Sequence, residues 1–255
     1  MTCKPEEFQI SVLAGLLNQP HINHVAVGAA SPIPGAAALL AQQLGGGRLD
    51  VTIIHGNANN AFTDGGRELF DCAGQGRIDA FFLGGVQIDG QANINLVGTG
   101  TYPDLERRFP GSFGSAYMYF TVPHVILFRP EHSRRVFVEK VDFISAPGIS
   151  PPDVHRPGGP KSLMTELCLM AFDGARGRFR LVSVHPGHSL EEILDNTGFS
   201  FDIPDSVPET QAPSEAVLVQ LRSVIAPEIA KTYPGFASRV FAITPEIREF
   251  EENVR

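Results

Sequence analysis

Residues 81–95 read FFLGGVQIDGQANIN, an apolar run followed by two glycines and then by polar side chains. Such a run is typical of a buried strand, and glycines after it let a ligand approach the backbone closely. Amide and carboxylate side chains beside such a turn can hold a ligand by hydrogen bonds. We therefore predict a small-molecule site formed by Gly84, Gly85, Gln87, Asp89, Asn93 and Asn95. The alternative is a tight turn whose polar groups only satisfy one another.

Other apolar runs extend this strand into a sheet. Residues 24–27, 51–54, 79–83 and 125–128 have the pattern of strands covered on both faces, which predicts a mostly parallel sheet. Residues 167–172 and 179–184 flank a glycine-containing loop and predict a hairpin, so the sheet should be mixed. Flanking helices are predicted over residues 8–17 and 36–44, from Ser189, and from residue 213, and a charged tail or helix over residues 246–255. We expect one open α/β domain over residues 1–255.

Composition argues against several classes of function. The net charge is −8 and no dense Lys/Arg stripe is present, which disfavours a nucleic-acid-binding surface. Neither a secretory signal nor a membrane span is predicted, so the expected location is cytoplasmic. Cys3, Cys72 and Cys168 form no CxxC pair, and we predict buried, inert thiols. His185 and His188 lack neighbouring carboxylate or Cys ligands, so no metal site is predicted.

Three segments in this order resemble the β subunit of a family I CoA-transferase of the glutaconate CoA-transferase type. They are residues 82–89 with Asn93 and Asn95, residues 135–148, and residues 194–199. The resemblance implies an open α/β sheet of the kind shared by CoA-transferases and sugar-phosphate isomerases. It also implies a CoA-transferase α subunit as partner and an active site between the unlike subunits. The substrate would be coenzyme A or an acyl-CoA, and no cofactor would be bound permanently.

The resemblance exposes a departure at the catalytic position. Members of the family use a glutamate of the β subunit, at the end of the strand before the Gly-Gly strand, to carry CoA covalently through an acyl anhydride and a glutamyl thioester. Here that strand reads VTIIHGN over residues 51–57, and His55 fills the glutamate position. Residues 51–60 contain no Asp or Glu. An imidazole cannot hold CoA as a thioester, but it can activate water for hydrolysis or C–C cleavage.

A second departure lies in FPGSFGSA, residues 109–116, where the family usually has a Gly-Ser-Gly-Gly-Ala-Asn run. Phe113 replaces one glycine, which predicts an altered acyl pocket. The resemblance implies ligand contacts for Gly111, Gly114 and Ser115, and the backbone N–H groups of the last two are predicted oxyanion donors. Ala92 replaces the glycine of the family's Asp-x-x-Gly-Asn. The turn over residues 28–35 is predicted to help shape the CoA or acyl pocket.

Three functions stay open at this point. The first is the β subunit of a heteromeric enzyme that transfers CoA between carboxylic acids. The second is a subunit of an acyl-CoA hydrolase or of a ring-opening C–C hydrolase. The third is a non-catalytic chain that completes a site on its α subunit. Product analysis separates the first two, because transfer requires an acceptor acid and hydrolysis does not.

Overall fold

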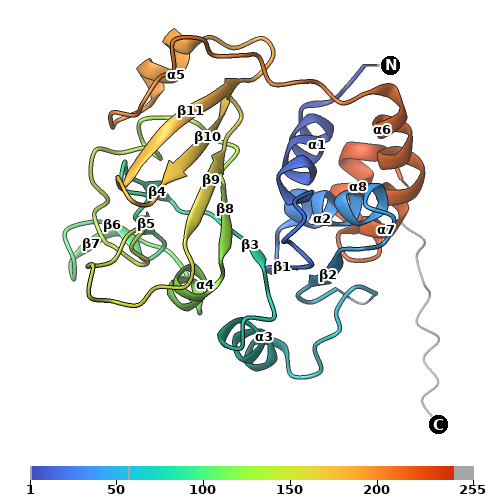
Figure 1. Ribbon diagram of the computed structural model, residues 1–255, viewed down its shortest axis with the longest axis horizontal. Coiled ribbons are helices and arrows are strands. Elements are labelled where there is room, and N and C mark those ends of the chain that lie inside the picture. Colours follow the sequence, from blue (N-terminus) through green and yellow to red (C-terminus); the bar gives the residue numbers. More distant parts are fainter. Residues whose placement is uncertain (1, 57, 244–255) are drawn as a thin grey trace.

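A seven-stranded sheet forms the centre of the computed structural model, which describes residues 2–56 and 58–243 (Figure 1). Its strand order is β11-β10-β9-β8-β3-β1-β2. In chain order these strands are β1 (His24–Val27), β2 (Asp50–Ile53), β3 (Ala80–Leu83), β8 (His124–Phe128), β9 (Pro160–Met164), β10 (Cys168–Asp173) and β11 (Arg178–Val184). The run from β2 to β9 is parallel, whereas β10 pairs antiparallel with both β9 and β11. The prediction of an open, mostly parallel and mixed sheet is confirmed.

Helices and short strands make up the other elements. The helices are α1 (Pro5–Leu17), α2 (Pro32–Leu44), α3 (Gly65–Gly74), α4 (Ser115–Thr121), α5 (Leu190–Asn196), α6 (Glu215–Gln220), the π-helical turn η1 (Leu221–Ile225), α7 (Ala226–Ala230) and α8 (Pro234–Phe241). Two small antiparallel pairs are formed by β4 (Gln87–Ile88) with β5 (Ile94–Asn95), and by β6 (Gly98–Gly100) with β7 (Leu105–Arg108). Among the helices of the described residues, none combines the length and the apolar character needed to cross a membrane.

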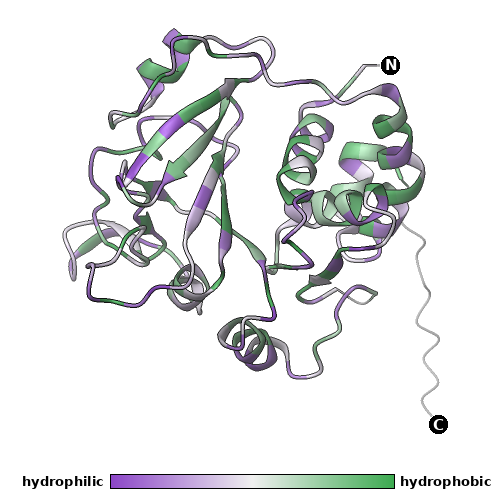
Figure 2. Ribbon diagram, in the orientation of Figure 1, coloured by the Kyte–Doolittle hydropathy of each residue, from purple (hydrophilic) through white to green (hydrophobic). Residues whose placement is uncertain are grey.

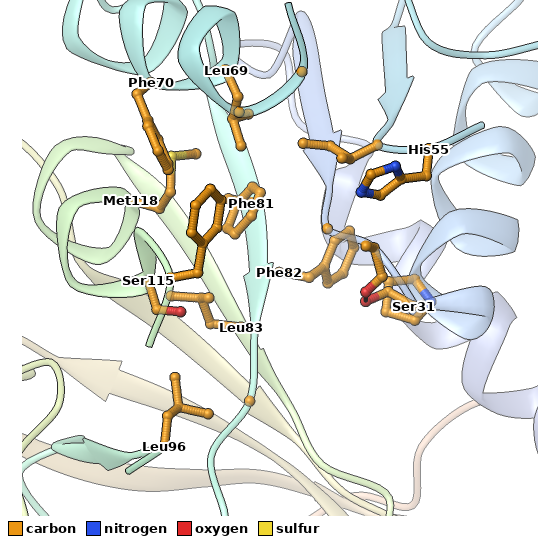
Figure 3. Close-up of a pocket in the computed structure, with 18 of the residues that line it drawn as sticks. Ser31, His55, Leu69, Phe70, Phe81, Phe82, Leu83, Leu96, Ser115 and Met118 are labelled. Carbon is orange, nitrogen blue, oxygen red and sulfur yellow. Dashed lines mark hydrogen bonds between the residues drawn. The ribbon is translucent and has the colours of Figure 1, made fainter. Parts of the chain in front are cut away.

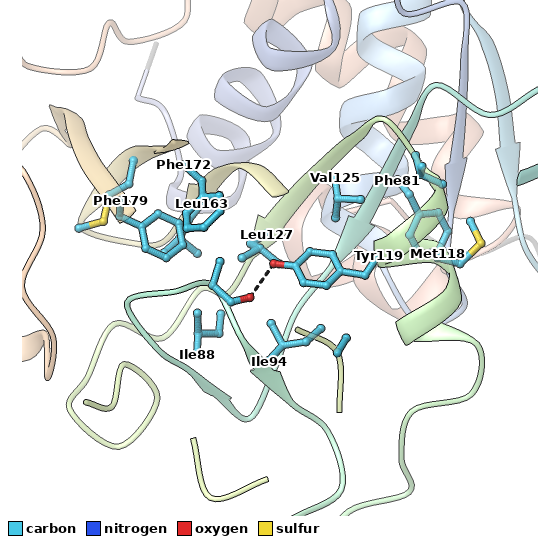
Figure 4. Close-up of a cluster of buried hydrophobic side chains, with 14 of the residues drawn as sticks. Phe81, Ile88, Ile94, Met118, Tyr119, Val125, Leu127, Leu163, Phe172 and Phe179 are labelled. Atoms are coloured by element: carbon cyan, nitrogen blue, oxygen red, sulfur yellow. Dashed lines mark hydrogen bonds between the residues drawn. The ribbon is translucent and has the colours of Figure 1, made fainter. Parts of the chain in front are cut away.

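Each face of the sheet buries its own hydrophobic core. Val25 and Val27 of β1 and Phe82 of β3 pack in the core that α1, α2 and the C-terminal helices cover, on one side in Figure 1. Ala26 and Phe81, the alternate residues, belong to the second core (Figure 4). This alternation follows from the two-residue repeat of a strand. Along β11 alternate residues are buried, and Figure 2 shows both hydrophobic and hydrophilic segments on this strand. Because the central strands are buried on both faces, the apolar runs in the sequence predicted their positions.

Several boundaries differ from the predicted ones. Strands β1, β2, β3 and β8 lie within one residue of the predictions. Helix α2 begins at Pro32 instead of residue 36, because proline fits the first turn of a helix, where its missing N–H is not needed. Ser189 accepts a hydrogen bond from the Glu192 N–H as the predicted helix cap, and Ser214 accepts one from the Val217 N–H at the start of the helix predicted from residue 213. The predicted tail over residues 246–255 lies outside the described residues.

The cysteine prediction holds for two of the three thiols. Cys72 and Cys168 are buried, and burial raises the pKa of the Cys168 thiol to about 12, which keeps it inert. Cys3 is only partly buried, contrary to the prediction, because it precedes α1 near the start of the chain.

Two buried histidines give the fold a pH dependence. Burial lowers the pKa of His132 and of His185 from 6.5 to about 4. The ring nitrogens of His132 lie 2.8 and 2.9 Å from the hydroxyls of Thr165 and Thr197, contacts that a neutral ring satisfies. Between pH 6.5 and 4 the unfolded chain therefore binds more protons than the folded chain. The free energy of unfolding must fall as the pH drops through this window.

We expect the unfolding free energy to be lower at pH 4.5 than at pH 7 by an amount on the order of 2 kcal/mol for His132. Urea unfolding at several pH values measures this, and His132→Gln should make the profile less steep, with the contribution of His185 remaining. The exposed His155 serves as the control, since His155→Gln should leave the profile unchanged. A native profile that is flat between pH 7 and 4.5 would contradict the prediction.

Candidate active site

A pocket of about 520 Å³ opens at the carboxyl ends of the parallel strands β1, β2 and β3 (Figure 3). Ligands of open α/β sheets bind at this edge. The lining comes from the turn after β1, the end of β2, the first turns of α3, the end of β3, and the loop that leads into α4. The predicted role of residues 28–35 in shaping a pocket agrees with this, because Gly28, Ala29, Ser31 and Pro34 are all lining residues.

His55 lies at the end of β2 and lines the pocket, opposite Phe70 and Met118 in the view of Figure 3. Its backbone has φ +65°, the left-handed region that few residues other than glycine adopt. Hydrogen bonds on either side fix this turn, because the N–H of Ile54 donates to the carbonyl of Val27 and that of Gly56 to the carbonyl of Ile53, both at 2.9 Å. A strained backbone that its surroundings hold in place is typical of functional sites.

Four of the predicted site residues line the pocket, namely His55, Gly84, Gly111 and Ser115. Gly84 lies where the backbone is crowded, since a Cβ there would come within 2.8 Å of the Phe128 carbonyl oxygen. Gly85 is crowded in the same way, against the carbonyl oxygen of Gln87 at 2.6 Å. The paired glycines therefore allow close contact between backbone segments of this chain itself.

The predicted polar residues form an internal hydrogen-bond network. The carbonyl oxygen of the Gln87 side chain accepts from Asn95 Nδ2 at 2.8 Å and from the Asp142 backbone N–H at 3.0 Å, and its amide donates to the Asp142 carboxylate at 3.1 Å. In a second group, the Asn93 amide donates to Asp89 Oδ2 at 3.0 Å. All four predicted side chains are buried. These bonds account for their polar groups, and contact with a ligand stays a prediction for Gln87, Asp89, Asn93 and Asn95.

The loop before α4 and the first residue of this helix contain the backbone N–H groups that were predicted to bind an oxyanion. Gly111 and Gly114 have φ +107° and +59°. The backbone N–H of Ser115, a predicted oxyanion donor, already donates to the carbonyl of Ser112 at 3.0 Å. Ser115 also brings a hydroxyl to the pocket wall (Figure 3). A Cβ on Gly114 would lie 2.1 Å from the Phe70 ring, so this glycine makes room for an aromatic wall.

Sequence reasoning missed most of the apolar lining. Leu69 and Phe70 come from α3, a helix whose start at Gly65 and Gly66 hides it, because glycine is a poor helix former. Met118 comes from α4, another helix that was not predicted. The spacing of buried Leu69, Cys72 and Ala73 at i, i+3 and i+4 is the signal that could have revealed α3.

Most side chains that line the pocket are uncharged. Among the described residues that line the pocket, His55 is the ionisable one, and Ser31, Asn60 and Ser115 supply the other polar side chains. No Asp, Glu, Lys or Arg belongs to this set. In the described part of the chain, no group of three or more His, Cys, Asp or Glu is placed to hold a metal ion.

The family model for coenzyme A transferase matches residues 13–196 of this sequence. The chain belongs to the coenzyme A transferase family. The β subunit of 3-oxoadipate CoA-transferase from Pseudomonas knackmussii is 33% identical over 221 residues, covering 84% of this chain and 81% of that protein. The β subunit of glutaconate CoA-transferase from Acidaminococcus fermentans is 35% identical over 153 residues, covering 57% of this chain and 56% of that protein. The resemblance to a β subunit of this family is confirmed.

Other relatives of this chain carry a different activity in their names. The cholesterol ring-cleaving hydrolase IpdB subunit of Rhodococcus jostii is 28% identical, covering 63% of this chain and 64% of that protein. The crystal structure of IpdAB from Rhodococcus jostii superimposes with a TM-score of 0.79 at 23% identity, covering 89% of this chain and 96% of that one. At this identity the superposition shows the shared fold alone.

Ala92, which stands where the family has a glycine, has an unusual backbone conformation. Ala92 is fully buried and has φ +59°, the conformation that a glycine adopts more readily. Its N–H donates to the carbonyl of Asp89 at 2.9 Å, and its own carbonyl accepts from the Tyr119 hydroxyl at 2.7 Å (Figure 4). The turn therefore keeps a left-handed residue although the glycine is absent.

Proposed function

We propose that this chain is the β subunit of a heteromeric enzyme that acts on an acyl-CoA, and that the enzyme cleaves its substrate without an acceptor acid. The observation that carries the proposal is the content of the pocket at the end of β2, where His55 is present and no carboxylate belongs to the described lining. The family match supports the acyl-CoA, and the relatives named as one subunit of a CoA-transferase support an α subunit as partner.

CoA transfer through this chain alone would need a carboxylate in the pocket. The carboxylate must attack the thioester carbonyl, form an anhydride and then hold CoA as a thioester. An imidazole in that position can be acylated, but it has no acyl carbon to which the CoA thiol can return. Residues 51–60 supply no Asp or Glu that a small shift of the strand end would bring into place.

His55 suits the role of general base in hydrolysis. Its side chain lines the pocket, where a ring nitrogen can accept a proton from a water molecule. The hydroxide then attacks the thioester carbonyl carbon, and the tetrahedral intermediate breaks its C–S bond. The departing thiolate takes the proton from the imidazolium, which returns His55 to its neutral form.

A second candidate is CoA transfer with a carboxylate from the α subunit. It is favoured by the 33% identity with a 3-oxoadipate CoA-transferase subunit over 84% of this chain. A third is a chain without catalytic groups that only completes the α-subunit site. Both share the acyl-CoA substrate with the first proposal. The second candidate differs from it because it requires an acceptor acid, and the third because it does not require His55.

Reconstitution tests the proposal directly. We expect the chain, co-purified with an α-type subunit and supplied with a panel of acyl-CoA esters, to release free CoA at the same rate with and without acceptor acids. The measurement follows free thiol and identifies the acyl product by mass spectrometry. Formation of the acceptor's own CoA ester, with no net release of free thiol, would favour the second candidate and remove His55 from the mechanism.

A further inference from the structure

The apolar walls of the pocket indicate what kind of acyl group the substrate carries, an inference that rests on the proposed function. Phe70, Phe81, Phe113 and Met118 form one side of the pocket, and the rings of Phe70 and Phe113 lie 5.5 Å apart between centroids. Rings at this spacing contact each other, and their outer faces and edges offer an aromatic surface to a flat ligand ring. The cavity of about 520 Å³ falls in the range of small-molecule sites and exceeds the needs of a short acyl chain.

Two glycines in neighbouring segments leave the space that these rings occupy. A Cβ on Gly66 would lie 3.0 Å from the Phe113 ring, and one on Gly114 would lie 2.1 Å from the Phe70 ring. The two rings therefore rest directly against the backbone of α3 and of the loop before α4. Because this packing holds the aromatic wall in place, the wall is a defined surface of the pocket.

Two arginines that follow lining residues in the sequence are paired with carboxylates of this chain. Arg67 follows the lining residues Gly65 and Gly66, but its side chain is 83% exposed and pairs with Asp64 at 3.0 Å. Arg129 follows the lining residue Phe128, and its guanidinium pairs with Glu131 at 3.1 Å. A carboxylate at the far end of an acyl group would therefore be taken out of water without a cation from the described lining residues. Burial of an unpaired charge is strongly unfavourable.

We propose that the acyl group of the substrate is an uncharged aromatic or alicyclic ring and carries no second carboxylate. In this respect the chain differs from relatives named for 3-oxoadipate and glutaconate, acids that each have two carboxyl groups. The ring packs against the surface formed by Phe70, Phe113 and Met118, and the thioester carbonyl lies toward His55, the one ionisable group of the described lining.

Thioether analogues of CoA test this proposal without turnover. The reconstituted complex is titrated by calorimetry with S-phenacyl-CoA, with S-(4-carboxyphenacyl)-CoA, which adds only a carboxylate to the same ring, and with free CoA. We expect the carboxylate to weaken binding at least about 10-fold. Equal or tighter binding of the carboxylated analogue would overturn the inference and leave the proposed function intact. If none of the three compounds binds, both the inference and the proposed function fail.

A charge introduced into the wall should reverse the preference. Phe113 is 82% exposed in the chain, so Phe113→Arg is compatible with folding. This variant should bind the carboxylated analogue at least about 10-fold more tightly relative to S-phenacyl-CoA than the native complex does. Tyr102→Arg adds the same charge at an exposed aromatic outside the pocket lining and should leave the ratio unchanged. An equal effect of both variants would assign the change to net charge and contradict the placement of the acyl group.

Discussion

Replacing His55 by glycine is expected to lower kcat of the reconstituted complex at least about 100-fold, because the variant removes the proposed general base. Glycine is the informative choice at this position. The backbone has φ +65° there, which glycine adopts without strain, so the variant should fold at least as well as the native chain. A loss of activity with an unchanged melting temperature can then be assigned to the imidazole and not to the turn.

Two comparisons sharpen this experiment. His155→Gly removes an exposed histidine outside the pocket lining and should leave kcat unchanged. His55→Glu restores a carboxylate at the strand end and should produce acceptor-dependent CoA transfer, which the native complex lacks under the proposed function. Activity of the His55→Gly complex within a few-fold of native would instead support the non-catalytic role, provided that gel filtration shows an intact assembly.

The central strands could be predicted from the sequence because their burial on both faces requires a local run of apolar residues. Strands such as β1 and β3 are buried on both faces, and a short continuous apolar run records that burial directly. Strand β9 was missed because it begins at Pro160 and contains the exposed Lys161, so its apolar residues do not form a run. Its place in the sheet depends on pairing with β8 and β10, which no local pattern records.

The site was predictable in part for a similar reason. Gly84 was found because it follows a recognisable strand, and His55 because the resemblance places the family's glutamate at the end of the preceding strand; the carboxyl ends of these parallel strands meet at one edge. The polar residues after Gly85 drew attention through their side-chain chemistry, yet they are buried and hydrogen-bond to one another. A sequence shows which groups can form hydrogen bonds, but whether the partner is a ligand or the same chain depends on tertiary contacts.

That internal network leads to the largest effect on stability that we expect. Gly148 is buried, and its N–H donates to the side-chain oxygen of Asn93 at 3.1 Å. A Cβ at this position would lie 2.1 Å from the carbonyl oxygen of Gln91 and 2.7 Å from the backbone of Ala92. Both neighbours are backbone atoms, which cannot turn aside as the end of a flexible side chain can.

Gly148→Ala should therefore lower the free energy of unfolding by about 3 kcal/mol or more, as a forced backbone shift in a packed interior does. The shift would also break the bond from Gly148 to Asn93 and so disturb the turn at residues 89–93 that follows the pocket strand. Gly174→Ala is the matched control, because a Cβ there meets nothing within 4 Å and the residue is exposed. Urea unfolding of the two variants side by side measures the difference. Equal stabilities would mean that the segment around Gly148 yields easily and does not hold the turn at residues 89–93 rigidly.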